Sequence, residues 1–223
     1  MFKKTIETSD APNLIVNDCL GDLTVRGSEE TELTIRVPDE STLTLQQEGE
    51  GWIINAQSDC RLTCPLGATL TINAVRGDLN VKSVTGDVTI KDIYGDARLK
   101  DIGPLNLSQA YGDVTLRAVG ETTVGQIFGD LQARHVAGNL QATSISGDAA
   151  IRGLDGKLML QQVASDLSAE GVLGGLEVAQ VGADIRLAPP FTPGMTYVMQ
   201  AGSDIVIELD DDARVQMSLQ AGG

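Results

Sequence analysis

The chain has 223 residues, of which 16 are basic and 31 acidic, and its formal net charge is −15 at pH 7. This charge opposes binding to nucleic acids and to anionic membrane surfaces, because both are held through positive electrostatic fields. No apolar run approaches the length of about 18 residues that a membrane-spanning helix needs. We therefore expect neither a nucleic-acid partner nor insertion into a membrane.

The N-terminal residues lack the features of a signal peptide. Such a leader has a basic start and then an apolar run, whereas Met1–Lys4 is followed by the polar stretch Thr5–Asp10. Three cysteines, an odd and small number, suit a reducing compartment better than a disulfide-built secreted domain. We expect a cytoplasmic protein, or a cell-envelope protein if this sequence is a fragment of an exported one.

Residues 1–76 contain short alternating apolar segments, each typical of one strand. Glu48–Gly51 lies between two of them and predicts a hairpin turn. Gly21-Asp22-Leu23-Thr24-Val25 already contains the phrase that is repeated later in the chain. We predict that this region forms irregular strands that cap the N-terminal end of the fold. The segments are 14–16, 23–25, 33–35, 43–45, 52–54 and 70–72.

From Gly77 to Gly182 the chain repeats one phrase twelve times, Gly-Asp-φ-x-φ-x-x-φ-x, in which φ is apolar. Thr122 is the only polar residue among the 36 φ positions. The first two φ residues lie two apart, so they leave the same face of a strand. We expect the glycine to take a positive φ at a corner and the following aspartate to bond nearby backbone. Because one unit cannot bury its apolar side alone, the units must stack as a solenoid. The units begin at Gly77, Gly86, Gly95, Gly103, Gly112, Gly120, Gly129, Gly138, Gly147, Gly156, Ser165 and Gly174.

Odd and even units differ in chemistry, which shows how many units make one coil. Odd units share an aspartate after the glycine, whereas the even units have no common residue type there. We therefore predict an all-β, single-stranded, right-handed β-helix with two units, or about 17–18 residues, in each coil. The odd-unit aspartates include Asp78, Asp96, Asp113, Asp130 and Asp148.

The same register predicts two more columns of stacked side chains. A basic column lies four residues after the aspartates, and an aromatic column immediately precedes three consecutive odd units. Coils stacked about 4.8 Å apart would place the members of each column above one another. The basic residues are Lys82, Lys100, Arg117, Arg134 and Arg152, and the aromatic residues are Tyr94, Tyr111 and Phe128.

The regular solenoid is predicted over residues 77–187, and residues 188–223 are expected to form C-terminal strands with an acidic cap. A proline-rich stretch, 188–194, interrupts the repeat. Three further strands are expected at 197–199, 205–209 and 215–219, with Asp210–Asp212 as a turn between two of them. We treat all three regions as one continuous domain.

Each group of residues that could bind a ligand or a metal also has a purely structural interpretation. Asp at the second place of a nonapeptide differs from the calcium-binding β-roll pattern, so we expect the aspartates to cap corners and pair with the basic column. That basic column could instead bind a polyanionic glycan. Cys19, Cys60 and Cys64 lack a fourth ligand for a metal, and His135 is expected to be a solvated surface residue. We predict no cofactor and no metal.

An enzyme is disfavoured by the equivalence of the repeated positions. Polysaccharide-cleaving β-helices need inequivalent acidic neighbours, whereas the acidic column here repeats one position. The aromatic column could stack sugar rings, although a stacked column at a corner is more often structural.

The phrase Cys64-Pro65-Leu66-Gly67-Ala68-Thr69-Leu70, leading into Gly77-Asp78-Leu79-Asn80-Val81, resembles a bacterial family of β-solenoid domains known as putative adhesins. The resemblance covers nearly the whole chain and rests on degenerate motifs. It implies a single-stranded β-helix found in cell-envelope or envelope-stress proteins, without known catalytic residues.

The function expected from these observations is that of a non-enzymatic scaffold or adhesion-type interaction module with a protein or glycan partner. Two alternatives remain open at this point. One is a glycan-binding module. The other is a structural protein that polymerises end to end through its coil ends, similar in architecture to the bactofilins.

Overall fold

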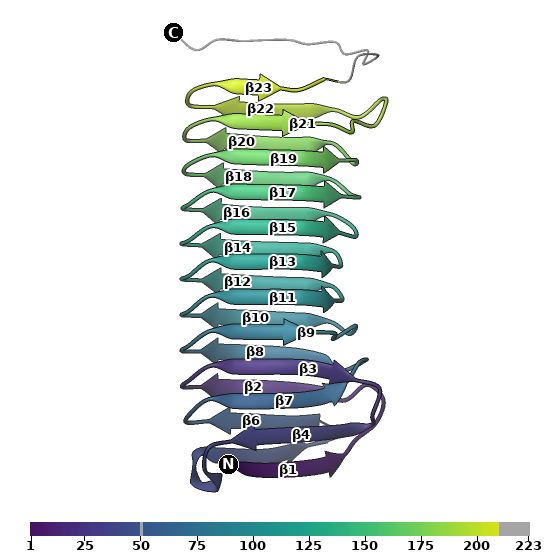
Figure 1. The fold of residues 1–223 in the computed structure, drawn as a ribbon, viewed down its shortest axis with the longest axis vertical. Helices are drawn as coiled ribbons and strands as arrows, with labels where there is room; N and C mark the ends of the chain where they lie inside the picture. Colours follow the sequence, from purple (N-terminus) through teal and green to yellow (C-terminus); the bar gives the residue numbers. More distant parts are fainter. Residues whose placement is uncertain (50, 210–223) are drawn as a thin grey trace.

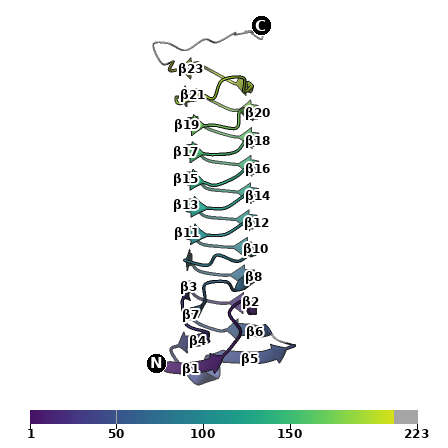
Figure 2. The same cartoon turned by 90° about the vertical axis from the view of Figure 1, so that its right-hand side faces the viewer.

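The computed structural model describes residues 1–49 and 51–209. Two long β-sheets face each other, and the chain passes alternately from one sheet to the other, which makes a stack of flat coils (Figures 1 and 2). We call the 12-stranded sheet sheet A and the 11-stranded sheet sheet B. Apart from one 3-10 turn at Glu40–Thr42, no helix occurs in the described residues, and none could span a membrane. The prediction of an all-β solenoid is confirmed.

The regular coils follow the repeat unit by unit. Odd units supply strands to sheet A, and even units supply strands to sheet B. In sheet A these strands are β9 (Leu79–Lys82), β11 (Ala97–Ile102), β13 (Val114–Val119), β15 (Leu131–Val136), β17 (Ala149–Leu154) and β19 (Leu167–Val172). In sheet B they are β10 (Val88–Ile93), β12 (Leu105–Ala110), β14 (Thr122–Ile127), β16 (Leu140–Ile145), β18 (Leu158–Val163) and β20 (Leu176–Val181).

Parallel pairing between successive coils fixes the coil length. Leu79 pairs with Ala97, and Ala97 pairs with Val114, so each step along sheet A spans two sequence units. Residues 77–182 thus form the predicted six coils, with two strands in each. Like residues of successive coils lie directly above one another, so every sequence column becomes a physical column.

The space between the sheets is filled by the apolar columns. Leu116 is fully buried, as is Ile90, and the φ positions of both sheets form one continuous core. Thr122 is the only buried polar residue among the described residues, and its hydroxyl donates a hydrogen bond of 3.0 Å to the carbonyl of Gly120. Its polar group is therefore satisfied inside the core.

A left-handed residue explains how the third apolar position of each odd unit also faces the core. Leu99 and Ile102 are three residues apart, so in a straight strand they would point to opposite faces. Asp101 between them has a φ of 52°, and the pairing passes from Lys100–Arg117 directly to Ile102–Val119. A single residue lies between these pairs on both strands, so the register is kept, and its left-handed conformation turns each strand so that the next apolar residue faces the core. The equivalent residues are Ser83, Ala118, His135, Gly153 and Gly171.

Replacing Ala118 by glycine should stabilise the protein. Ala118 has a φ of 50°, and the left-handed region costs a non-glycine residue about 1–2 kcal/mol. Part of that gain is offset by the larger entropy loss of glycine, so we expect a net increase of about 0.5–1 kcal/mol in the free energy of unfolding, measured by urea denaturation. The control Ala150→Gly, in β17 without a positive φ, should instead lower stability. Equal effects of the two changes would contradict the left-handed conformation of Ala118.

The region that precedes the regular coils, residues 1–76, is only partly irregular. β2 (Asn13–Cys19) and β3 (Leu23–Ser28) form one regular coil, and β6 (Gly51–Ala56) and β7 (Cys60–Pro65) form another. The chain does not stack them in sequence order. The β2–β3 coil lies between the β6–β7 coil and β8 (Thr69–Val75), which enters the regular solenoid.

The cap at this end consists of antiparallel strands. β4 (Glu32–Val37) pairs with β7, β1 (Phe2–Glu7) pairs with β4, and β5 (Leu43–Glu48) pairs with β6. The predicted hairpin at Glu48–Gly51 joins β5 to β6, with Gly49 at a φ of 60°. Antiparallel strands break the repeat, and β1, whose charged side chains are exposed, is the outermost strand of sheet A.

At the other end the coils continue beyond the repeat with β21 (Ile185–Ala188), β22 (Tyr197–Ala201) and β23 (Ile205–Ile207). Two of the three C-terminal strands expected from the sequence are therefore present. The predicted turn at Asp210–Asp212 and the predicted strand at 215–219 lie outside the described residues.

Candidate functional site

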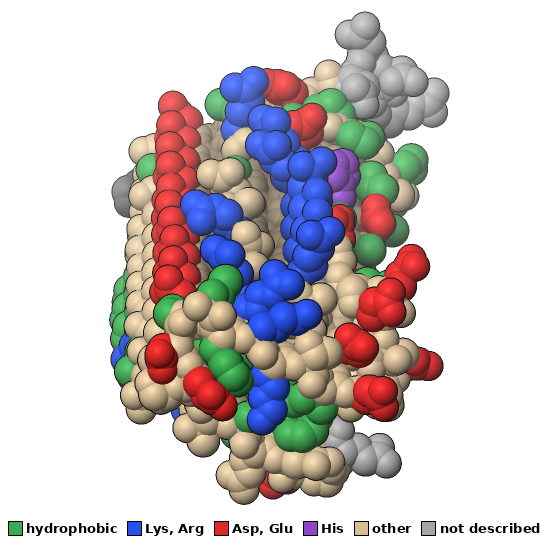
Figure 3. Space-filling view, turned by 60° about the horizontal axis from the view of Figure 1, so that its bottom comes forward, with side chains coloured by type: hydrophobic (Ala, Val, Ile, Leu, Met, Phe, Trp, Pro, Cys, Tyr) green, Lys and Arg blue, Asp and Glu red, His purple; other side chains and the backbone are tan. Residues whose placement is uncertain are grey.

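The outer face of sheet A carries the most distinctive surface of the molecule. Figure 3 shows a red acidic column and a blue basic column along the solenoid, with further side chains between them, some of which are also blue. We call the two columns the aspartate ladder and the basic ladder, and the side chains between them the middle column. Each aspartate immediately precedes a strand of sheet A, and the basic residue of that strand follows four positions later, which corresponds to roughly 13 Å along an extended strand.

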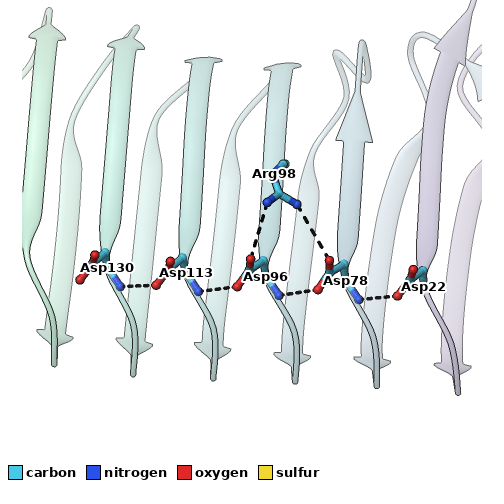
Figure 4. A network of polar contacts seen from close by, with 6 residues as sticks. All are labelled: Asp22, Asp78, Asp96, Arg98, Asp113 and Asp130. Atoms are coloured by element: carbon cyan, nitrogen blue, oxygen red, sulfur yellow. Dashed lines mark hydrogen bonds and ion pairs between the residues drawn. The ribbon is translucent and has the colours of Figure 1, made fainter.

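Each aspartate of the ladder bonds to the backbone of the next coil. The N–H of Asp113 donates to Oδ1 of Asp96 at 3.0 Å, and the N–H of Asp130 donates to Oδ1 of Asp113 at 2.9 Å (Figure 4). Nine such bonds join ten aspartates into one chain of contacts. In stacking order the ladder runs Asp59, Asp22, Asp78, Asp96, Asp113, Asp130, Asp148, Asp166, Asp184 and Asp204.

The corner glycines leave room for these carboxylates. A Cβ on Gly112 would lie 2.6 Å from Oδ1 of Asp96, and one on Gly147 only 2.0 Å from Oδ1 of Asp130. The expectation of a positive φ at these corners is wrong, because neither glycine has one. Ser165, Ala183 and Ser203 take the place of glycine before three other ladder aspartates, whose bonds are 3.0–3.1 Å. The aspartate is thus the constant part of the contact that joins the coils.

The predicted pairing of the aspartate ladder with the basic ladder does not occur among the described residues. The cation that contacts the aspartates is Arg98, whose guanidinium lies 3.6 Å from Asp96 and 4.0 Å from Asp78 (Figure 4). Arg98 lies only two residues after Asp96, whereas the basic ladder is four residues away on the same strand and out of reach. Sequence reasoning named the wrong cation column for this contact.

The basic ladder stacks as predicted and has one more member. Parallel pairing places Arg26, Lys82, Lys100, Arg117, Arg134 and Arg152 in consecutive coils, and Glu170 follows Arg152. Lys100 lies 3.7 Å from Asp101, and Arg152 lies 3.4 Å from Glu170. Within the described part of the chain the other four members have no carboxylate within 4.0 Å.

The aromatic column forms a stack with its ring faces turned to one another. The centroids of Tyr94 and Tyr111 are 4.9 Å apart and those of Tyr111 and Phe128 are 5.1 Å apart, with interplanar angles of 11° and 7°. The guanidinium carbon of Arg76 lies 4.3 Å from the centroid of Tyr94, in cation–π geometry. The three residues are 42–48% exposed, while both faces of Tyr111 are covered by the neighbouring rings and Tyr94 lies between Arg76 and Tyr111. Sugar rings stack on aromatic faces, so this geometry favours the structural interpretation of the column.

A shallow groove of about 180 Å³ lies beside the aspartate ladder. It is bounded by Asp96, Asp113 and Asp130 on one side and by Arg98, Thr115 and Gln132 on the other. The middle column therefore offers hydrogen-bonding groups and the guanidinium of Arg98 in a recess. His135, expected at the surface, is exposed next to Arg134 (Figure 3).

The three cysteines are free and buried. Burial raises the pKa of the Cys60 thiol to about 12 and that of Cys64 to about 11. The thiol of Cys19 points to the carbonyls of Ser58 and Gly21 at 3.4 and 3.5 Å, and burial raises its pKa too. Protonated thiols in the core contribute packing, because the thiolate is the form that ligates metals.

Calcium should leave the melting temperature unchanged. One oxygen of each ladder aspartate already accepts a backbone N–H, and no cluster of three metal-ligating side chains occurs in residues 1–49 and 51–209. A ligand at 100 times its dissociation constant would stabilise the folded state by about 2.7 kcal/mol. Thermal melting in millimolar calcium measures this directly, and a reproducible rise that Asp113→Asn abolishes would contradict the expectation.

Comparison with known proteins agrees with this geometry. The Toastrack DUF4097 family matches residues 5–222. Two crystal structures share the fold, each covering 93% of this chain and 96% of its own: a putative adhesin from Parabacteroides merdae, with 14% identity and a TM-score of 0.54, and one from Parabacteroides distasonis, with 16% identity and a TM-score of 0.52. No curated protein matches the sequence.

Proposed function

Because this chain belongs to the Toastrack DUF4097 family, we propose that it is a non-enzymatic, adhesion-type interaction module that binds its partner along the outer face of the solenoid. The names of the two similar structures, both putative adhesins, support this proposal. The observation that carries it is the segregation of charge on sheet A. Two continuous ladders of opposite sign run over successive coils, and each repeats one chemical position many times.

Such a surface suits binding better than catalysis. Members of a ladder occupy equivalent positions, whereas acid–base catalysis uses neighbours whose pKa values differ. A rigid array of equivalent sites is suited to binding a partner that is itself repetitive.

Retention on an array of neutral and acidic glycans tests this function. We expect retention on a subset of glycans, with no new reducing ends released from the retained ones. Cleavage of a retained glycan would overturn the non-enzymatic assignment. Retention of none, together with no change in mass on mixing with candidate protein partners, would overturn the interaction module itself.

End-to-end polymerisation is a second candidate, supported by the C-terminal edge. Ile205 and Val206 of β23 are 41% and 52% exposed at the last described strand of sheet A. The antiparallel cap at the N-terminal end opposes this candidate, because it offers no matching parallel edge. Light scattering over a range of protein concentrations distinguishes the two functions, and a mass that grows with concentration would favour the polymer.

A further inference from the structure

We propose that the basic ladder is a binding site for an acidic polysaccharide, which lies along the solenoid axis with its carboxylates on the ladder and its hydroxyls on the middle column beside it. This inference rests on the proposed function as an interaction module and specifies its ligand class.

The fold itself does not require cations at this position. Even units place their residues at the same distance from the corner on sheet B, and six of them are Lys91, Ser108, Gly125, Thr143, Gln161 and Ala179. One of these six is charged, and the parallel pairing of sheet B continues on either side of them, for example from Ile90–Leu107 to Asp92–Gln109. The basic ladder is therefore a property of this surface and not of the architecture.

Stacking like charges also opposes folding. Members of the ladder are parallel neighbours in register, about 4.8 Å apart at the backbone. Two unit charges 4 Å apart in water repel each other by about 1 kcal/mol. The aspartate ladder gives little relief, because it lies roughly 13 Å away along the strand, beyond the Debye length of about 8 Å at physiological salt. A polyanion bound on the ladder would remove this repulsion.

The arrangement across the face indicates the kind of polyanion. From one side to the other the face has the aspartate ladder, the middle column and the basic ladder. The middle column is neutral at Asn80, Thr115 and Gln132, the last two of which line the groove, and it carries Arg61, Arg98 and Arg186 in other coils. A ligand on this face needs anionic groups along one edge and hydrogen-bonding groups along the other. A uronic-acid polymer, with carboxylates and hydroxyls on each sugar, meets both conditions.

Other polyanions fit this face less well. Single-stranded nucleic acids are held by aromatic platforms on which bases stack, and the ring faces of Tyr94, Tyr111 and Phe128 cover one another. A duplex or polyphosphate presents charge on both edges, so the aspartate ladder would repel it. A second copy of the chain could set its aspartate ladder against the basic ladder, but two molecules with a net charge of −15 each repel one another.

Polygalacturonate is the probe for the test, with dextran as the neutral polymer and an oligothymidylate as the nucleic acid, all without calcium and at low ionic strength. We expect the wild-type protein to bind polygalacturonate, and added salt to weaken that binding. The double variant Arg117→Gln/Arg134→Gln should bind at least about tenfold more weakly, because it loses two of the six stacked cations. The charge-matched control Lys3→Gln/Lys91→Gln should change the affinity by less than about twofold.

Melting curves of both double variants establish that they are folded, since all four side chains lie outside the core. Equal affinity of the two double variants, equal binding of dextran, or equally tight binding of oligothymidylate would overturn the acidic-polysaccharide assignment. A doubled mass that Asp113→Asn abolishes would show a second copy on the ladder instead. Selective binding of neutral glycans would overturn this inference while leaving the interaction module intact, and release of reducing ends would overturn the module's non-enzymatic character.

Discussion

Leu116→Asp is expected to abolish folding. Leu116 lies in the middle of β13 with no exposed surface, between Leu99 and Ala133 in the neighbouring coils. An unpaired carboxylate in this apolar column costs several kcal/mol or more, a large share of the roughly 5–15 kcal/mol that stabilises a typical domain. Because each coil contacts only its neighbours, the defect separates the stack into two parts. Far-UV circular dichroism and thermal melting measure the loss.

Thr123→Asp is the matched control. Thr123 lies in β14 on the outer face of sheet B and is exposed, so the same new carboxylate there meets water. We expect this variant to melt within a few degrees of the wild type, since exposed substitutions usually change stability by less than about 0.5 kcal/mol. A soluble Leu116→Asp protein with a cooperative transition would contradict the assignment of the apolar columns.

The regular coils could be predicted from the sequence because every unit repeats the same pattern of residues. Spacing of apolar residues identified the strands, and the difference between odd and even units identified the coil. Asp78, Asp96 and Asp113 recur at 18 and 17 residues, and the structure places them in one ladder with this spacing. Among the additional members, Asp22 follows Gly21 as in the repeat, whereas Asp59, Asp184 and Asp204 follow a serine or an alanine and therefore had a weaker signal.

The order of the first coils could not be predicted, because local sequence does not show which coil stacks on which. Asp22 and Asp59 both follow a corner, and either could have been the neighbour of Asp78. In the structure the N–H of Asp78 donates to Oδ1 of Asp22, and the N–H of Asp22 donates to Oδ1 of Asp59. Long-range pairing of the cap strands decides this order, and a repeat pattern carries no information on it.

The contacts that the charged columns make could also not be predicted from the sequence. Opposite charges four residues apart in one unit suggested pairing, but along a strand this is roughly 13 Å. Arg98, which contacts Asp78 and Asp96, belongs to a column in which the next two coils have Thr115 and Gln132. An ion pair that occurs in one coil only leaves no periodic signal. Residues that differ from those at the same position in neighbouring coils, such as Arg98, thus distinguish one stretch of the surface from another.

The second large effect is expected from deleting half a coil. Removing residues 112–119 joins Tyr111 to Gly120, which moves every later strand to the opposite sheet. β14 would then lie beside β11, whose left-handed residue Asp101 has no counterpart in β14. Asp130 and all later ladder aspartates would move to the other corner. The apolar columns would still match, so we expect a folded but strongly destabilised protein.

Deleting a whole coil, residues 112–128, is the control. It joins Tyr111 to Gly129 and leaves each later strand in its own sheet. Asp130 would then donate its N–H to Oδ1 of Asp96, as Asp113 does now. This deletion removes about twice as many residues and more buried surface than the half-coil deletion, yet it preserves every column, so we expect a small loss of stability only.

The central claim is that two sequence units form one coil and that the columns of the two sheets are not interchangeable. Thermal melting of the two deletion variants, measured side by side, tests it most directly. We predict that the protein lacking residues 112–119 melts at least about 5 °C below the one lacking residues 112–128, since in a domain of this size 1 kcal/mol shifts the melting temperature by roughly 2–4 °C. Equal melting temperatures, or a more stable half-coil deletion, would contradict the claim.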